Sequence, residues 1–316
     1  DKTLSPRAPP LKQGFARLRP MPQSPLIFDP TLIRTRRLRA LPDYENARFL
    51  HREIAERMAE RLDDLTARFP VTLATNGRGG VSADVLKGRG GIETLIEADA
   101  ATSLLRDTGP RAVLSFETLP FTNGALDCVF AANELHQVND LPGALVQIRR
   151  ALRPDGLFLG AIFGPETLNP LRLAFLEAEA ALDAPVSPHI APTIDIRDAA
   201  GLLQRAGFAL PVADTETITV SYANPFKLLQ DLRGMAETNI LHERSRCPLR
   251  RAVLMRALQL LQEKAAGPDG RINIPFEIIF LTGWAPAPTQ QQPLRRGSGE
   301  VSMANVFGVP DGAKDD

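Results

Sequence analysis

A glycine-rich turn and an acidic strand end are the residues of this chain best suited to bind a nucleotide-like ligand. The turn Asn76-Gly77-Arg78-Gly79-Gly80 follows a short apolar run. Gly77 and Gly79 would let backbone N–H groups approach a ligand beside the positive end of the next helix. Asp99 ends a second apolar run about 20 residues later, where a carboxylate commonly accepts hydrogen bonds from ribose hydroxyls. A glycine-rich turn without a ligand fits these residues equally well, so its interpretation depends on the surrounding elements.

Other polar side chains fall at the ends of the next predicted strands. Ser115 ends a run at 112–115, and residues 133–136 open a polar hinge after a buried run at 125–132. Ligands of parallel α/β sheets bind at the carboxyl ends of the strands. The predicted cofactor-binding residues are therefore Gly77, Gly79, Asp99, Ser115, Asn133 and His136.

Catalytic residues are harder to assign. His136 and His189 lie in loops at the expected mouth of the pocket and are the two catalytic candidates, although a structural hydrogen-bonding role is favoured for each. The sequence His51-Arg52-Glu53 could supply iron ligands only on a strand, where residues two apart point to the same side. It lies in a predicted helix, where residues two apart point to different sides, so we expect these side chains to lie on the solvated surface. Cys128 and Cys247 form neither a metal-binding spacing nor a disulfide framework. We therefore expect no metal site.

A parallel sheet would bring these residues together. Residues 119–164 contain a strand pattern at 125–132, an amphipathic helix pattern at 142–152 and a second strand pattern at 157–163. Pro154 and Gly156 are typical of the turn between that helix and the second strand. This order is a βαβ unit, and strands at 71–75, 92–96 and 112–115 precede it. The sequence predicts an α/β fold.

The remaining elements are predicted from hydrophobic periodicity. A helix is expected at 43–69, with Asp43 as N-cap and Pro70 as its stop. Helices are also expected at 166–182, 196–206, 225–242 and 248–264. Strands at 212–222 and 276–284 would pair as an antiparallel hairpin.

Composition excludes some functions. Of 316 residues, 44% are hydrophobic and 23% charged, and 37 basic and 37 acidic residues give a net charge of zero. The chain therefore carries no global basic footprint for nucleic acid. No apolar run approaches the roughly 20 residues of a transmembrane helix. Residues 1–26 are rich in Pro and Arg, with Asp1 their only acid, which fits a remnant of an organellar transit segment or, equally, a flexible tail or a truncation.

The order of the predicted elements and the residue motifs in 119–164 resemble those of the class I S-adenosylmethionine (SAM) methyltransferase superfamily. Within it, several segments are similar to the methyltransferase-like complex I assembly factors, described as protein arginine hydroxylases of mitochondrial and alphaproteobacterial type. The matching segments are IFD at 27–29, LHQVNDLP at 135–142, FGPETL at 163–168, SPHIAP at 187–192, QRAGF at 204–208, DLRGMAETN at 231–239 and GW at 283–284. The resemblance covers about residues 27–306.

The resemblance implies a Rossmann-like fold with a mostly parallel seven-stranded sheet, an antiparallel final strand and helical insertions in the C-terminal half. It divides the chain into a flexible basic tail at 1–26, a methyltransferase-like domain at 27–284 and an extended tail at 285–316. Within the domain, 27–164 would be the SAM-type half, and 165–284 the helical insertion and last strands. The implied cofactor is SAM, and the implied partner is a respiratory complex I subunit or assembly intermediate. The implied location is the mitochondrial matrix at the inner membrane, or the cytoplasm if the chain is bacterial.

The chain departs from the superfamily pattern at its SAM motif. Where the pattern is Asp-x-Gly-x-Gly-x-Gly, the acid is replaced by Leu73 and the first glycine by Thr75. Ser115 stands where an acid usually contacts the adenine, and Gln137 where the family usually has Trp. Leu73 cannot accept a hydrogen bond, and Thr75 adds a Cβ where the backbone should pass close to the cofactor with positive φ. Each lost charge-assisted hydrogen bond costs about 1.5–3 kcal/mol, so we expect SAM binding to be weakened or lost.

Three functions follow from these patterns. The first is a non-catalytic or weakly catalytic assembly or accessory protein of complex I, acting through protein contacts. The second is an active SAM-dependent enzyme that modifies a protein side chain by hydroxylation or methyl transfer, favoured by Asp99, His136 and Asn139. The third is a small-molecule or acyl-carrier methyltransferase, against which the family-like C-terminal half argues.

Overall fold

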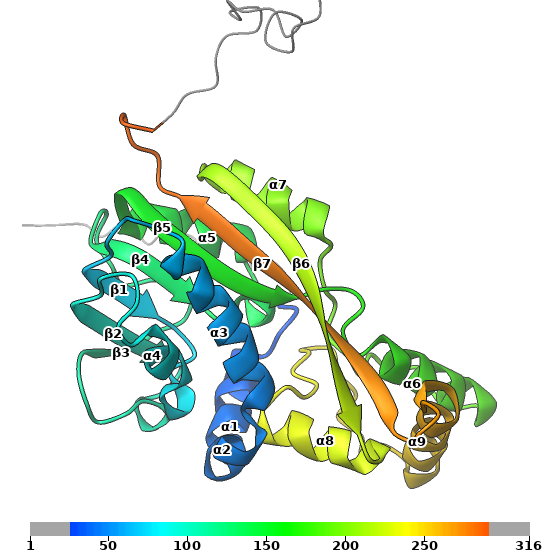
Figure 1. The fold of residues 1–316 in the computed structure, drawn as a ribbon. Coiled ribbons are helices and arrows are strands. Elements are labelled where there is room, and N and C mark those ends of the chain that lie inside the picture. The colour runs from blue at the N-terminus through cyan, green and yellow to red at the C-terminus, as the bar shows by residue number, and fades with distance from the viewer. Residues whose placement is uncertain (1–25, 291–316) are drawn as a thin grey trace, which may run out of the picture.

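The fold is built on one seven-stranded sheet with the order β3-β2-β1-β4-β5-β7-β6 (Figure 1). The computed structural model describes residues 26–290, so most of the predicted tails at 1–26 and 285–316 lies outside the described residues. The strands are β1 (Val71–Ala74), β2 (Thr94–Asp99), β3 (Arg111–Val113), β4 (Leu126–Ala131), β5 (Leu152–Phe163), β6 (Ala209–Tyr222) and β7 (Ile272–Trp284). Strands β1 to β5 pair in parallel, and β7 is antiparallel to both β5 and β6. The predicted mostly parallel sheet with an antiparallel final strand is confirmed.

The central strand β4 shows why the sheet lies in the middle of the protein. All six of its residues are buried, as expected for a parallel strand covered on both faces. Phe130 packs into one core cluster together with Leu50 and Ile54 of α3 (Phe49–Asp63). Val129, its neighbour, packs into another cluster together with Leu145 of α5 (Leu141–Ala151). Alternate side chains therefore build two cores, one on each face of the sheet.

Two helices on the second face match their predictions closely. Helix α5 begins where Asp140 accepts a hydrogen bond from the Gly143 N–H, and α7 (Ile196–Ala206) begins where Asp195 accepts one from the Asp198 N–H. Both caps satisfy N–H groups that the first turn of a helix leaves unpaired. The turn expected at Pro154 and Gly156 instead lies within β5, because the strand begins at Leu152 and continues through an irregular register opposite β4.

The helix expected at 43–69 is divided and shorter. A short α2 (Tyr44–Ala47) precedes α3, which ends at Asp63, and Asp43 makes no side-chain cap. After β1, α4 (Val81–Leu86) follows the glycine-rich turn. After β2, residues Thr102–Leu104 form a 3-10 turn.

The C-terminal half adds helices around the far ends of the two longest strands. Figure 1 shows β6 and β7 running past the parallel strands toward α6 (Asn169–Ala181), α8 (Pro225–Gly234) and α9 (Arg251–Ala265). The predicted helical insertion is therefore present. The helix expected at 225–242 ends at Gly234. The division of the chain into halves at residue 164 stays a prediction.

One helix near the N-terminus was not predicted. Helix α1 (Pro30–Ala40) begins at the N-cap Asp29, whose side chain accepts from the Leu32 N–H, and carries Pro30 in its first turn. It has no apolar stripe, which explains why periodicity does not reveal it. No helix within residues 26–290 is long and apolar enough to cross a membrane.

Candidate functional site

The glycine-rich turn lies between β1 and α4, as predicted. The Thr75 N–H donates to the Phe130 carbonyl at 3.0 Å and so extends the β1–β4 ladder by one residue. The positive φ expected at Thr75 occurs instead at Asn76, with φ 54°. The turn therefore starts one residue later than expected, and an asparagine, which tolerates this conformation, occupies its first left-handed position.

The space beside the glycines is filled by the chain itself. A Cβ added at Gly77 would lie 2.6 Å from Leu105 Cδ2, and one added at Gly79 would lie 3.2 Å from Tyr44 Cδ1. The glycines thus permit close packing of protein side chains at the place where the superfamily pattern predicts a ligand.

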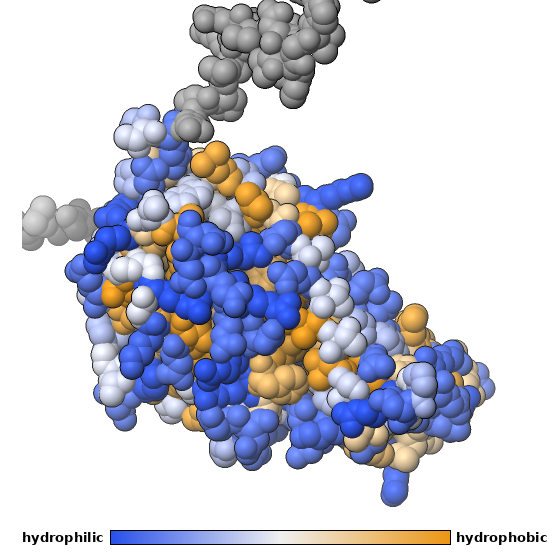
Figure 2. All heavy atoms as spheres, viewed as in Figure 1, coloured by the Kyte–Doolittle hydropathy of each residue, from blue (hydrophilic) through white to orange (hydrophobic). Residues whose placement is uncertain are grey.

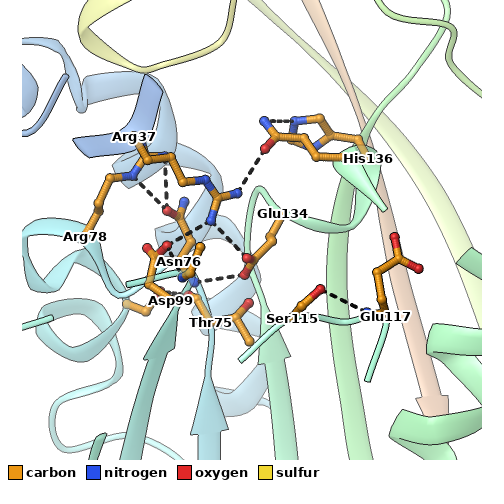
Figure 3. Close-up of polar contacts among 12 residues, drawn as sticks. Arg37, Thr75, Asn76, Arg78, Asp99, Ser115, Glu117, Glu134 and His136 are labelled. Atoms are coloured by element: carbon orange, nitrogen blue, oxygen red, sulfur yellow. Dashed lines mark hydrogen bonds and ion pairs between the residues drawn. The ribbon is translucent and has the colours of Figure 1, made fainter. Parts of the chain in front are cut away.

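A buried arginine joins the two carboxylates at the strand ends (Figure 3). Arg37 Nη1 donates to Asp99 Oδ1 at 3.0 Å and to Glu134 Oε1 at 2.9 Å, while Nη2 donates to Gln137 Oε1 at 3.0 Å. The side chain of Arg37 is 2% exposed and that of Asp99 0%. Burial disfavours the charged guanidinium, but the charges of Glu134 and Asp99 outweigh this effect and raise the pKa of Arg37 above its ordinary value. Arg37 therefore remains charged.

A second buried arginine, Arg78, lies in the same region. Arg78 donates to Asn76 Oδ1 and to the Met235 carbonyl at 3.0 Å, and its guanidinium lies 4.6 Å from the centre of the Tyr44 ring. The Asn76 N–H in turn donates to Glu134 Oε2 at 3.2 Å. We call Arg37, Asn76, Arg78, Asp99 and Glu134 the strand-end network.

The other predicted cofactor residues have different surroundings. Ser115 is exposed, and its Oγ accepts from the Glu117 N–H at 3.2 Å, away from Arg37 (Figure 3). Asn133 is buried and donates to the His51 carbonyl at 3.3 Å. The structure thus brings Asp99 and the glycine turn together but leaves Ser115 outside the network.

A carboxylate that is only 11% exposed, Glu237, contacts three side chains beside the network. It lies 3.2 Å from His136 Nε2, 3.0 Å from Gln137 Nε2 and 3.4 Å from His51 Nε2. Burial alone would raise the pKa of Glu237, but the charge of His136 and the hydrogen bonds with His136 and His51 hold it well below its ordinary value.

The surface position expected for His51 is wrong. The side chain is fully buried, and Tyr44 Oη lies 2.9 Å from its Nδ1. Burial lowers the pKa of His51 and so favours the neutral ring. Although His51, His136 and Glu237 meet here, no group of three or more His, Cys, Asp or Glu side chains in residues 26–290 is arranged to hold a metal ion.

A cavity of about 880 Å³ lies beside Glu237. His136 and His189, the two catalytic candidates, both line it; the other five predicted cofactor residues do not. The His136 ring packs on Phe163 with ring centres 4.5 Å apart, and the His189 ring stacks on Phe175 at 4.2 Å. His189 Nε2 lies 2.7 Å from Glu179 Oε1. Both histidines thus line one cavity, which is separate from the other predicted cofactor residues at the strand ends, and a catalytic role for either stays a prediction.

Sequence reasoning missed three residues that shape this region: Arg37, Tyr44 and Glu237. The pair Asp29-Pro30 was a usable signal for α1, because an N-cap followed by proline at the first helical position is a helix start. Glu237 lies inside the segment 231–239 that carried the family resemblance, but nothing in the sequence showed that it would contact His51 and His136.

The sheet order with its antiparallel β7 and the strand-end location of the predicted site define the class I SAM-dependent methyltransferase fold. A family described as methyltransferase domain matches residues 77–160. The crystal structure of the YcgJ protein from Bacillus subtilis has the same fold, with a TM-score of 0.50 and 13% identity over 73% of this chain and 98% of that one.

Two relatives specify the family further. The mitochondrial arginine-hydroxylase NDUFAF5 of Danio rerio is 33% identical over 289 residues, covering 89% of both chains. The malonyl-[acyl-carrier protein] O-methyltransferase of Xylella fastidiosa is 30% identical over 294 residues, covering 90% of this chain and 97% of the relative. The chain belongs to the arginine-hydroxylase NDUFAF5 family.

Proposed function

We propose that the chain is an assembly or accessory protein of respiratory complex I that acts by binding a protein partner, and that its own side chains close its SAM position. The observation that carries this proposal is the bonding of Arg37 to Asp99 and Glu134. In this proposal, SAM does not fit among the side chains at the strand ends as they are arranged in the structure. Asp99 Oδ1 already accepts from Arg37 and from the Ala100 N–H, and Tyr44 packs over Gly79.

The energetic argument concerns the displacement of Arg37. Moving this side chain away from Asp99 and Glu134 would leave buried carboxylates without their partner, which costs about 3–5 kcal/mol when a buried ion pair is broken. A loss of about 3 kcal/mol already weakens binding more than a hundredfold. Leu73, buried in the core, offers no compensating hydrogen bond. Both effects weaken the binding of SAM.

Family membership supports a proposed partner and location. The Danio rerio relative is a mitochondrial protein by name, which supports a mitochondrial location. The proposal further assigns the chain to the matrix, with peripheral attachment to the inner membrane. Bacterial relatives support the bacterial cytoplasm as the corresponding location in a prokaryote. The partner would be a complex I subunit or assembly intermediate, and the zero net charge gives no reason to expect nucleic acid.

A complementation experiment tests the non-catalytic role. In cells that lack the native chain, assembled complex I is quantified on native gels after re-expression of wild-type, Ser115→Arg or Thr66→Arg chains. Both positions are exposed, so both variants should fold. Ser115→Arg places a long cation where the superfamily contacts adenine, and Thr66→Arg, in the loop before β1 at the opposite ends of the strands, is the matched control. The proposal predicts equal restoration by all three chains. Loss of complex I with Ser115→Arg alone would contradict it.

The alternative is an active SAM-dependent enzyme that modifies a protein side chain, by arginine hydroxylation or methyl transfer. Two buried oxygen atoms, Asp99 Oδ2 and Thr75 Oγ1, have no hydrogen-bond partner among the described residues and favour this alternative, because ligand hydroxyls would satisfy them. Selective failure of Ser115→Arg is the result expected from such an enzyme.

A further inference from the structure

The cavity beside Glu237 has mainly apolar inner walls. The side chains that form these walls come from β5, the following loop, α6, α9 and β7, and are largely removed from solvent: Phe163, Leu168, Leu171, Phe175, Leu254 and Phe276. Its volume of about 880 Å³ lies within the range of roughly 300–1,000 Å³ typical of small-molecule sites. In contrast, the face drawn in Figure 2 is mostly hydrophilic, with small apolar patches. The cavity is the better place for an apolar ligand group.

The polar side chains among the walls are mostly engaged within the protein, although His136 Nδ1 has no hydrogen-bond partner among the described residues. Thr167 Oγ1 bonds the Glu277 backbone, the Asn239 amide donates to the Pro188 carbonyl, and His189 is held by Glu179. A peptide inserted here would bury backbone N–H and C=O groups that find few free partners, which is costly. The inner part of the preferred ligand therefore lacks polar groups, as an alkyl chain does.

Positive side chains from two helices lie at the edge of the cavity. Arg36 and Arg39 come from α1, and Arg233 comes from α8. Within residues 26–290, neither Arg39 nor Arg233 has a carboxylate at ion-pair distance, and both are exposed. Burial and the positive charges of Arg244 and Arg39 lower the pKa of Arg36, as expected where cations gather.

The cavity is also lined by Lys227 and by the carboxylates Asp43, Asp231 and Glu237; Lys227 pairs with Asp231, and Glu237 contacts His136. The three arginines therefore outnumber the one remaining carboxylate, Asp43, and this excess of positive charge favours an anion.

We infer that the cavity binds a single-chain amphiphile, with its alkyl chain against Phe163, Leu171 and Phe175 and its anionic carboxylate or phosphate head near Arg39 and Arg233. The inference goes beyond the proposed function and holds whether or not SAM binds, because Asp99 and the glycine turn do not line the cavity. A free fatty acid and a phospholipid-type molecule share this chemistry.

The experiment is a calorimetric titration of the full chain with four probes of equal chain length: decanoate, decyl phosphate, decanol and decyltrimethylammonium. We expect saturable binding of at least one of the two anionic probes, at least tenfold tighter than binding of decanol or the cationic probe. Decanoate as the tighter ligand would assign a fatty-acid source, and decyl phosphate a phospholipid-type source. Equal binding of the anionic, neutral and cationic probes would overturn the inference.

Paired variants locate the site. We expect Arg39→Gln/Arg233→Gln to weaken binding of the anionic probes about tenfold, since two partly solvated charge contacts are lost. The control Arg197→Gln/Arg205→Gln removes two exposed arginines on α7, on the other face of the sheet, and should leave binding unchanged. Leu171→Trp should block binding by filling the cavity, with thermal unfolding used to verify that the variant is folded.

Two further results would overturn the inference. The first is unchanged binding of the anionic probes to folded Leu171→Trp. The second is tighter binding of an acidic leucine-containing peptide, abolished by Leu171→Trp, which would assign the cavity to a protein segment. SAM titration of the same variants reports on the strand ends separately, so failure of this inference is distinct from failure of the proposed function.

Discussion

Two neighbouring regions of this protein have opposite character. At the carboxyl ends of β1 and β2, Arg37, Asp99 and Glu134 form a charged, buried and filled network. Beyond Gln137 and Glu237, the adjoining space is a cavity of about 880 Å³. Gln137 links the two, because it accepts from Arg37 and donates to Glu237.

The difference separates the fold from its ligand sites. At the strand ends, Arg37 of α1 bonds Asp99 and Glu134, whereas the adjacent cavity is open. A methyltransferase fold by itself therefore does not specify which of the two regions binds a ligand.

The largest effect should come from the center of the filled region. Arg37→Met leaves Asp99 and Glu134 buried without their cation, and we expect the free energy of unfolding to fall by about 3–5 kcal/mol. Chemical denaturation measures this change. The control is Arg52→Met, which breaks the exposed pair with Glu56 and should cost less than about 1 kcal/mol. A similarly small loss of unfolding free energy in both variants would mean that the network contributes little to stability.

An intermediate effect is expected where the two regions meet. Glu237→Gln removes the charge that His136 and Gln137 contact, and should lower the unfolding free energy by about 1–3 kcal/mol at neutral pH. Because folding lowers the pKa of Glu237, its contribution is present above the ordinary value of 4.5 and is lost as pH falls through the lower folded-state pKa. The difference between wild type and variant should therefore narrow below about pH 4.5. A constant difference would contradict this account; exposed Glu243→Gln is the control.

The smallest effect tests the packing over the glycine turn. Gly77→Ala places a Cβ 2.6 Å from Leu105 Cδ2 and should destabilise by about 1 kcal/mol, since the buried Leu105 side chain would have to shift. Gly201→Ala in α7 meets no atom within 4 Å and should instead stabilise by up to about 1 kcal/mol. Thermal unfolding compares the two. Stabilisation by Gly77→Ala would mean that the space over the turn is open.

The elements with strong local signals were predictable. Helix α7 was predicted with the bounds observed, because Asp195 and Gly207 mark its two ends and its apolar residues fall on one face. Strands β1 and β4 agree within one residue at each end, since their apolar runs lie between turn residues. Strand β2 begins two residues later and ends three residues later than expected, because pairing with β1 and β3 decides its limits.

The strand-end network was not predictable in the same way. An arginine on a helix without an apolar stripe is normally solvated, and only the distant Asp99 and Glu134 make burial of Arg37 favourable. His51 was misplaced for the same reason, since Tyr44 and Glu237 hold it inside. The acidic strand end and the glycine turn were located correctly because both depend on the order of the chain. What occupies the space between them depends on tertiary packing.

The most direct test of the account is the affinity of the wild-type chain for SAM, measured by isothermal titration calorimetry. If Arg37 closes the site, no binding will be detected in the micromolar range. A saturable micromolar dissociation constant would contradict the account and favour an active SAM-dependent enzyme.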